Sequence, residues 1–181
     1  MRVTVFGSSM PMPGEPAYQE AMALGQILAK DGHTVLTGGY AGTMEAVSRG
    51  AAEAGGHVIG VTCAEIEHWR SDTAANAWVK EEWRRLTLQE RLMTLIDHCE
   101  AALALPGGVG TLLEICMMWN KLIIKAIPPC PLILIGQGWK TTLQSFWDEQ
   151  GQYVVEADRG WLSFVGTAEE AAERLRRKLF I

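Results

Sequence analysis

A glycine-rich turn between a strand-length apolar run and a helix-length apolar run constrains this chain more than any other feature. The run before it is residues 101–105, Ala-Ala-Leu-Ala-Leu, and the run after it is residues 112–124. The turn reads Pro106-Gly-Gly-Val-Gly-Thr111. In such a unit, unpaired backbone N–H groups collect at the positive end of the helix, where proteins bind phosphate. The stretch therefore predicts an α/β fold with an anion site at this turn.

The residues of this turn suit a phosphate ligand. Gly107, Gly108 and Gly110 permit positive φ and have no Cβ atoms that would keep an anion from the backbone. We expect their N–H groups, with that of Thr111, to bind the substrate phosphate. Glu114 lies three residues further, on the same helix face as Thr111. Thr111 and Glu114 also fit a capping box, but a capping box requires no glycines, so a ligand site is favoured.

Strand-length runs alternate with helix-length runs along the whole chain. This alternation predicts a parallel sheet with helices on both faces, a Rossmann-like α/β fold, in a single domain of residues 1–181. Strands are expected at residues 2–6, 33–37, 57–61, 101–105 and 131–135, with weaker signals at 153–155 and 164–165. Helices are expected at residues 17–30, 44–54, 86–98, 112–124, 139–150 and 168–179.

Residues 62–85 are harder to assign. Three tryptophans, at positions 69, 78 and 83, stand there among many charged residues. Side chains of this kind can form a lid or wall over a pocket, and they are equally typical of an amphipathic surface segment. The sequence leaves both interpretations open.

Two other predicted strands also end in glycine turns. Residues 7–9 read Gly-Ser-Ser, and residues 38–42 read Gly-Gly-Tyr-Ala-Gly. Because the carboxyl ends of parallel strands share one edge of the sheet, these turns should converge with residues 106–111 on one site. We expect six of their residues to bind substrate: Gly7, Ser8, Ser9, Gly38, Gly39 and Gly42. No acidic residue closes the second strand, where an NAD-binding domain holds the ribose, so a dehydrogenase is disfavoured.

Charge and composition limit the partners and the compartment. The net charge of −5 and the pI of about 5.4 argue against nonspecific nucleic-acid binding. No apolar run approaches the roughly 18 residues of a membrane helix, and the amino terminus lacks a signal-peptide layout. The histidines are scattered, so no metal site is expected. Four cysteines in apolar or strand-like stretches predict buried free thiols in a reducing cytoplasm: Cys63, Cys99, Cys116 and Cys130.

Arg91 is a second candidate for chemistry. It stands 15 residues before Pro106, with apolar neighbours on the preceding predicted helix. One interpretation pairs it with Glu90 or Glu82 on a solvated face. The other places its planar guanidinium, which suits carboxylates and phosphates, against Glu114 or the ligand. Spacing alone does not decide between the two.

Residues 106–114 resemble the Pro-Gly-Gly-x-Gly-Thr-x-x-Glu signature of the LONELY GUY (LOG) family, the cytokinin riboside 5′-monophosphate phosphoribohydrolases. The family's upstream arginine matches Arg91 in spacing, and a glycine turn of the family resembles residues 38–42. The strand of residues 57–61, with the glycines before it, is also similar, and the similarity extends over residues 1–135.

The chain departs from the family pattern at three places. Leu92 follows the arginine where the family usually has lysine, and Tyr40 stands where a third glycine is common. Thr62 and Cys63 replace a proline that often follows the third strand. The phosphate turn is intact, and the identity of the base stays open.

The resemblance implies hydrolysis of the N-glycosidic bond of a nucleoside 5′-monophosphate, which releases the base and ribose 5-phosphate. It implies Glu114 and Arg91 as catalytic residues. An ionised Glu114, favoured by the helix N-terminus and the arginine, would offset positive charge on the ribose or activate water. Arg91 would orient Glu114 or hold the phosphate. No metal or redox cofactor is required.

A second function stays open: the protein binds a nucleotide as a sensor or carrier and does not turn it over. The same broad superfamily also resembles proteins of this kind. Retention of both Arg91 and Glu114 favours the enzyme, whereas the variant turn around Tyr40 favours the binder. Apolar residues on several sides of the predicted helix at 112–124 indicate an interface, and the family resemblance implies a homodimer.

Overall fold

A parallel sheet organises the molecule. The computed structural model describes residues 1–70 and 73–178, and within them seven strands lie in the order β4-β3-β2-β1-β5-β6-β7. The strands are β1 (Arg2–Phe6), β2 (Thr34–Thr37), β3 (Val58–Cys63), β4 (Glu81–Arg85), β5 (Ala101–Ala104), β6 (Leu132–Ile135) and β7 (Leu162–Val165). All neighbouring strands pair in parallel. The predicted Rossmann-like α/β fold is confirmed.

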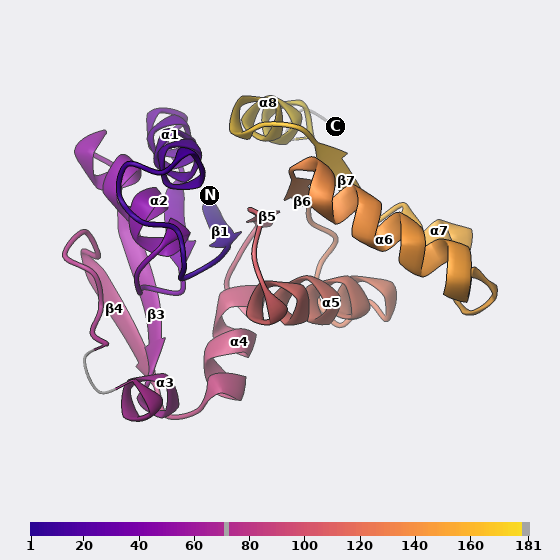
Figure 1. The fold of residues 1–181 in the computed structure, drawn as a ribbon, viewed down its shortest axis with the longest axis horizontal. Coiled ribbons are helices and arrows are strands. Elements are labelled where there is room, and N and C mark those ends of the chain that lie inside the picture. Colours follow the sequence, from indigo (N-terminus) through magenta and orange to yellow (C-terminus); the bar gives the residue numbers. More distant parts are fainter. Residues whose placement is uncertain (71–72, 179–181) are drawn as a thin grey trace.

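Helices cover both faces of this sheet (Figure 1). One face carries α1 (Pro16–Lys30), α2 (Thr43–Glu53) and α8 (Ala168–Lys178). The other carries α4 (Leu88–Asp97), α5 (Val109–Ile123) and α6 (Gln137–Gln150). Shorter elements lie in the connections: α3 (Ala64–Trp69), η1 (Gly151–Tyr153) and α7 (Glu156–Arg159).

Alternating side chains explain how one sheet serves two cores. On β1, Val3 and Val5 face the core under α1, α2 and α8, whereas Phe6 faces the core under α4, α5 and α6. On β5, Leu103 belongs to the first core and Ala104 to the second. Successive strand residues point to opposite faces, and here both faces are buried. Such strands read as nearly continuous apolar runs, which is why the sequence reveals them.

The strand order reverses beside β1. From β1 the chain adds β2, β3 and β4 outward on one side, and then returns to place β5 on the other side. Phe6 pairs with Ala104, so the two strands end at the same level. The turns that follow them therefore leave the sheet side by side, where open α/β sheets form ligand crevices.

The strand β4 was not predicted. It lies at the edge of the sheet, and its sequence, Glu-Glu-Trp-Arg-Arg, lacks the apolar pattern of a buried strand. Charged side chains are common on edge strands because they discourage pairing with another chain. Here Glu81 lies 2.9 Å from His57, and Arg84 forms an ion pair with Glu67.

Of the other predictions of secondary structure, one strand is wrong and the remaining elements are confirmed. The strand expected at 153–155 is wrong, because Gly151–Tyr153 forms a 3-10 turn and no strand follows it directly. The remaining strands and helices are confirmed to within three residues at their ends, including the weak signal at 164–165, which belongs to β7. Residue 179, the expected end of the last helix, lies outside the described residues.

The structure bears on two expectations, one about membrane helices and one about the cysteines. In residues 1–70 and 73–178, no helix is long and apolar enough to cross a membrane. None of the four cysteines takes part in a disulfide. The expected burial holds for Cys63 but is wrong for Cys116, which is exposed on α5, and Cys99 and Cys130 are half-buried.

Candidate functional site

A cavity of about 370 Å³ opens beyond the carboxyl ends of β1 and β5, a size within the range of small-molecule sites. Eight of the predicted site residues line it: Gly7, Ser8, Ser9, Arg91, Gly108, Gly110, Thr111 and Glu114. Much of the remaining wall is apolar or aromatic: Met10, Tyr40, Met44, Ile66, Trp69, Leu88 and Val109. The turns after β1 and β5 thus meet at one site, as the parallel sheet predicts.

The start of α5 forms one end of the cavity. The helix begins at Val109 with Gly108 as its N-cap, three residues earlier than predicted. The first N–H groups of a helix have no acceptor within it, and a glycine N-cap offers no side chain to bond them. Here these groups belong to Val109, Gly110 and Thr111, which all line the cavity. This end of the cavity can therefore bind an anion.

The glycines of this turn act through their missing side chains. None of Gly107, Gly108 and Gly110 has a positive φ, so this turn does not use the backbone freedom that glycine permits. A Cβ on Gly108 or Gly110 would meet no atom within 4 Å, whereas one on Gly107 would lie 2.2 Å from the Thr111 Oγ1. Gly107 therefore permits the tight turn, and the other two leave room for a ligand.

The capping-box alternative for Thr111 and Glu114 is wrong. Thr111 is the third residue of α5 and is buried, and no side chain caps this helix. A capping box does occur at the start of α4, where Thr87 and Glu90 bond each other's backbone N–H groups. Glu90 is therefore engaged at that cap.

Arg91 is buried against the strand ends, with only 6% of its surface exposed. Its Nε donates to the Val61 carbonyl at 2.7 Å, and its Nη2 donates to the Gly38 carbonyl at 3.0 Å. Glu82, one of its expected partners, accepts a hydrogen bond from Thr62 instead. The ion pair on a solvated face is therefore wrong, and the interpretation that places Arg91 near Glu114 holds.

Glu114 lies beside Arg91 in the same cavity. The distance from Arg91 Nη1 to Glu114 Oε1 is 3.9 Å, which is too long for a hydrogen bond. Burial raises the pKa of Glu114 to about 7, and the nearby Arg91 offsets this only in part. The expectation of a fully ionised carboxylate at neutral pH is wrong. Glu114 is the sixth residue of α5, beyond the first turn in which the helix dipole is effective.

The glycines of the second turn, residues 38–42, stand behind the cavity wall, whereas Tyr40 of the same turn is part of that wall. Gly38, Gly39 and Gly42 do not line the cavity, and neither does Gly107. A Cβ on Gly38 would lie 1.8 Å from Arg91 Nη2, and one on Gly42 would lie 2.3 Å from the carbonyl oxygen of the turn after β1. These glycines let neighbouring segments approach closely. Their direct contact with substrate stays a prediction.

Several residues of the site were not predicted. The Tyr40 ring lines the cavity, and Asn76 fixes its backbone by donating to the carbonyls of Gly39 at 3.0 Å and Tyr40 at 3.1 Å. Ile66 and Trp69 of α3 also line the cavity, so part of segment 62–85 is a pocket wall. Residues 71–72 of that segment lie outside the described residues. The only signal in the sequence was the helical spacing of two apolar residues among charges.

Comparison with known proteins places the chain in a family. The model of the SLOG cluster4 family matches residues 1–144. The chain belongs to this family. A cytokinin riboside 5′-monophosphate phosphoribohydrolase of Mycobacterium marinum is 36% identical over 60% of this chain, which spans 58% of that relative, just over half its length. The enzyme LOG3 of Arabidopsis thaliana, named for the same reaction, is 30% identical over 96% of this chain and 81% of its own.

These relatives confirm the resemblance to the LOG family. Among solved structures, the molybdenum cofactor binding protein of Rippkaea orientalis superposes with a TM-score of 0.77 at 20% identity. The superposition covers 98% of this SLOG family member and 96% of that chain. At this identity the likeness concerns the fold alone.

In residues 1–70 and 73–178, no group of three His, Cys, Asp or Glu side chains could hold a metal ion.

Proposed function

We propose that this protein hydrolyses the N-glycosidic bond of a nucleoside 5′-monophosphate and releases the free base and ribose 5-phosphate. One observation carries the proposal: the N–H groups that begin α5 and the buried carboxyl of Glu114 on the same helix face one cavity. A phosphate at the helix start would place the attached ribose beside the carboxyl. Relatives named as phosphoribohydrolases support this chemistry.

The phosphate end uses backbone donors. The N–H groups of Gly108, Val109, Gly110 and Thr111 would bind the 5′-phosphate, with the helix dipole favouring its negative charge. Ser8 and Ser9 come from the turn after β1, across the crevice, and their hydroxyls would bind the phosphate or the ribose. The helix start and the turn after β1 would thus contact the phosphate from two sides of the crevice.

The reacting end uses Glu114. When the base departs with the electron pair of the C1′–N bond, positive charge develops on the ribose. Ionised Glu114 would offset this charge and accept the proton of the water that attacks C1′. The departing base would take up a proton from solvent, and Glu114 would then return its own proton to solvent. A pKa of about 7 keeps both forms of Glu114 populated near neutral pH, which suits proton transfer. Arg91 Nη1, which lies 3.9 Å from Glu114 Oε1 and makes no hydrogen bond to it, would bind a ligand oxygen.

The test is release of free base from a panel of purine and pyrimidine nucleoside 5′-monophosphates, followed by chromatography. Glu114→Gln should lower turnover about 100-fold or more while nucleotide still binds, since the amide can neither offset the charge nor accept a proton. Glu149→Gln, an exposed carboxylate on α6, is the matched control and should leave turnover unchanged. Wild-type turnover in Glu114→Gln would exclude this role.

A nucleotide sensor or carrier is the second candidate, and one observation favours it. The bulky ring of Tyr40 lines the cavity at a position where the LOG resemblance implies glycine. Under this alternative, the wild-type protein binds nucleotides tightly but releases no base from any member of the panel. The same assay therefore separates the two functions.

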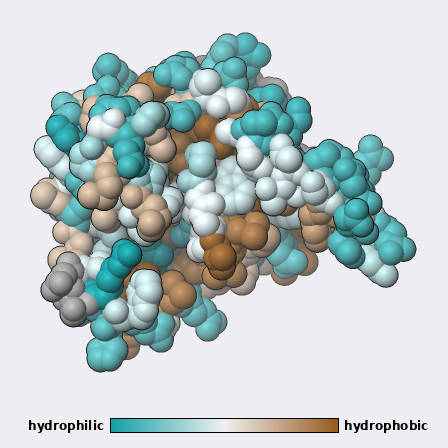
Figure 2. Space-filling model, in the orientation of Figure 1, coloured by the Kyte–Doolittle hydropathy of each residue, from teal (hydrophilic) through white to brown (hydrophobic). Residues whose placement is uncertain are grey.

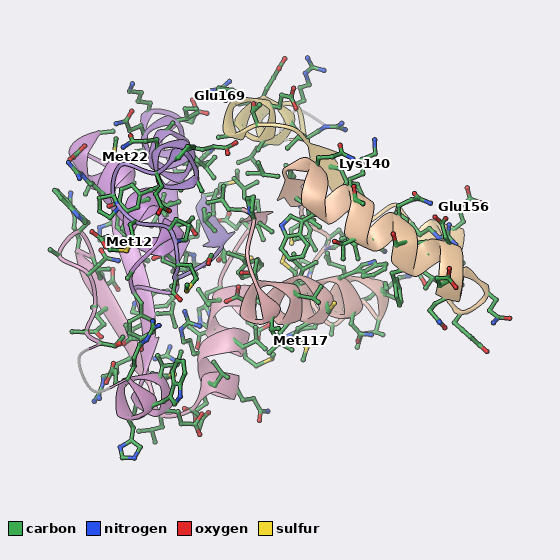
Figure 3. The ribbon with its side chains drawn as sticks, in the orientation of Figure 1. Met12, Met22, Met117, Lys140, Glu156 and Glu169 are labelled. Atoms are coloured by element: carbon green, nitrogen blue, oxygen red, sulfur yellow. The ribbon has the colours of Figure 1, made fainter. Side chains whose placement is uncertain are left out.

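We also propose a homodimer through the outer face of α5, in a cytoplasmic protein. Val109 is 85% exposed and Leu113 is 44% exposed, and Ile124 at the helix end is 64% exposed. Met117 lies on the side of α5 that faces away from the sheet (Figure 3), and hydrophobic surface gathers around this helix in Figure 2. Light scattering should give twice the mass of one chain, and a monomer at all concentrations would exclude the dimer.

A further inference from the structure

Tyr40 is held at both of its ends. Its backbone carbonyl accepts a hydrogen bond from the Asn76 amide at 3.1 Å. Its hydroxyl accepts from the Cys63 N–H at 2.8 Å and donates to the Cys63 carbonyl at 3.2 Å, at the end of β3. The side chain is 4% exposed, although its ring forms part of the cavity wall. The ring therefore has one fixed place between β2 and β3.

The guanidinium of Arg91 lies against this ring. Its Cζ is 5.5 Å from the ring centroid of Tyr40, which is within the range of a cation–π contact. The carbonyls of Val61 and Gly38 hold Nε and Nη2 on the same side, at the ends of β3 and β2. The remaining nitrogen, Nη1, is the one that faces Glu114 across 3.9 Å.

We propose that Tyr40 is a positioning residue for Arg91: its ring keeps the guanidinium withdrawn against β2 and β3, so that Nη1 makes no hydrogen bond to Glu114 and can bind a ligand oxygen instead. Without the ring, the guanidinium can turn toward the carboxylate and form the short, two-pronged ion pair that arginine favours. That pair would occupy Nη1 and hold Glu114 ionised. The consequence for turnover rests on the proposed function, whereas the positioning itself does not.

Among residues 1–70 and 73–178, few other groups can act on Glu114. The charged or titratable side chains that line the cavity are Tyr40, Arg70, Arg91 and Glu114. Arg70 follows α3, and its guanidinium lies 5.5 Å from the Trp69 ring. The proton affinity of Glu114 thus depends on its burial and on Arg91. When the burial of this carboxyl is kept, its ionisation therefore reports where Arg91 stands.

The experiment follows the Glu114 carboxyl by NMR in ligand-free protein with 13C-labelled glutamate, its signal identified by its absence in Glu114→Gln. Tyr40→Leu and Tyr40→Met keep an apolar side chain but remove the ring, and Tyr40→Phe keeps the ring. We expect the titration midpoint to fall by about one pH unit in Leu and Met, a tenfold change in the ratio of the two forms, and to stay within about 0.3 unit in Phe. Two ring-free variants guard against the loss of either through misfolding.

An unchanged or raised midpoint in both ring-free variants would overturn the proposal, because the two carbonyls would then hold Arg91 unaided. An equal fall in Phe would also overturn it, since the ring would not be the cause. In the base-release assay, the pH profile of kcat should move with the midpoint, while KM, set by the phosphate end, changes less than about twofold. If no variant and no wild-type protein releases base, the proposed function fails and the NMR result still decides the positioning.

Discussion

The turns after β5 and after β2 are both rich in glycine, yet different neighbours surround them. A Cβ on Gly108 or Gly110, after β5, would enter open space beside the cavity. After β2, a Cβ on Gly38 would reach within 1.8 Å of Arg91, and one on Gly42 would meet the backbone of the turn after β1. The first turn leaves room for a ligand, and the second is already filled by protein.

The difference shows what glycine spacing can and cannot report. A glycine indicates that something excludes a side chain, or that the backbone angle is unusual, but it does not identify what lies there. In residues 38–42 the excluding groups come from the start of α2 and also from β3, α4 and the turn after β1, which are distant in sequence. Only the folded chain brings them together.

The largest expected effect is that of Gly42→Ala on stability. Gly42 has φ +75, which costs an alanine about 1–2 kcal/mol, and the new Cβ would lie 2.3 Å from a backbone oxygen, which adds about 1–3 kcal/mol. We expect the free energy of unfolding in urea to fall by roughly 2–5 kcal/mol. Gly32→Ala is the matched control, because its φ is +76 and its Cβ would meet no atom within 4 Å. Equal losses in both variants would mean that the second turn is not close-packed.

The next effect concerns pH and the turn after β5. Burial raises the pKa of Glu114 from 4.5 to about 7, so the folded state favours the protonated form. The stability that this carboxyl contributes is complete below pH 4.5 and is lost as the pH rises through 7. Glu114→Gln should therefore be more stable than wild type above pH 7, by about 1–3 kcal/mol, with the difference shrinking toward pH 4.5.

Urea unfolding at a series of pH values measures this difference, and Glu149→Gln on the exposed face of α6 serves as the control. A difference that does not depend on pH would show that Glu114 keeps its ordinary pKa. Burying the Glu114 carboxyl beside the turn after β5 would then cost no stability, and the contrast with the close-packed turn after β2 would weaken.

The smallest effect on the fold is expected from Gly110→Ala. Alanine favours a helix by up to about 1 kcal/mol over glycine, so the variant should be as stable as wild type or slightly more stable. Its methyl group would stand where the phosphate approaches, and nucleotide affinity by calorimetry should fall about tenfold or more, which is about 1.4 kcal/mol.

Gly138→Ala is a close control for this variant. Gly138 is the second residue of α6 after a glycine N-cap, as Gly110 is in α5, and its Cβ would also meet no atom within 4 Å. It does not line the cavity, so it should share the effect on stability without the loss of affinity. Unchanged affinity in Gly110→Ala would show that no ligand occupies the open turn.

The fold was predictable where burial leaves a mark on the sequence. The strands β1, β2, β3, β5 and β6 are buried on both faces, and their apolar runs are found to within two residues. The strand β4 was not predicted because only its pairing with β3 makes it a strand, and that pairing joins segments distant in sequence. The apolar pair Val154 and Val155 misleads because two residues carry no period.

The identity of the site residues was predictable, but their ionisation and their contacts were less so. Glu114 and Arg91 follow from motif spacing, and both line the cavity. The pKa of Glu114 does not follow, because it depends on how deeply the fold buries the carboxyl. Tyr40 reads as a departure from a family pattern, and its contact with Arg91 emerges only in three dimensions.

The packing of the second turn has a consequence for engineering. Gly42 presses on the turn after β1, and the Thr43 N–H and hydroxyl both donate to the Ser8 carbonyl, at 2.8 and 3.1 Å. A designer who reshapes residues 38–42 therefore also moves Ser8 and Ser9, which line the cavity. Ile66 and Trp69 of α3 also line the cavity, so libraries that aim at a new base should diversify these two residues and leave both glycine turns as they are.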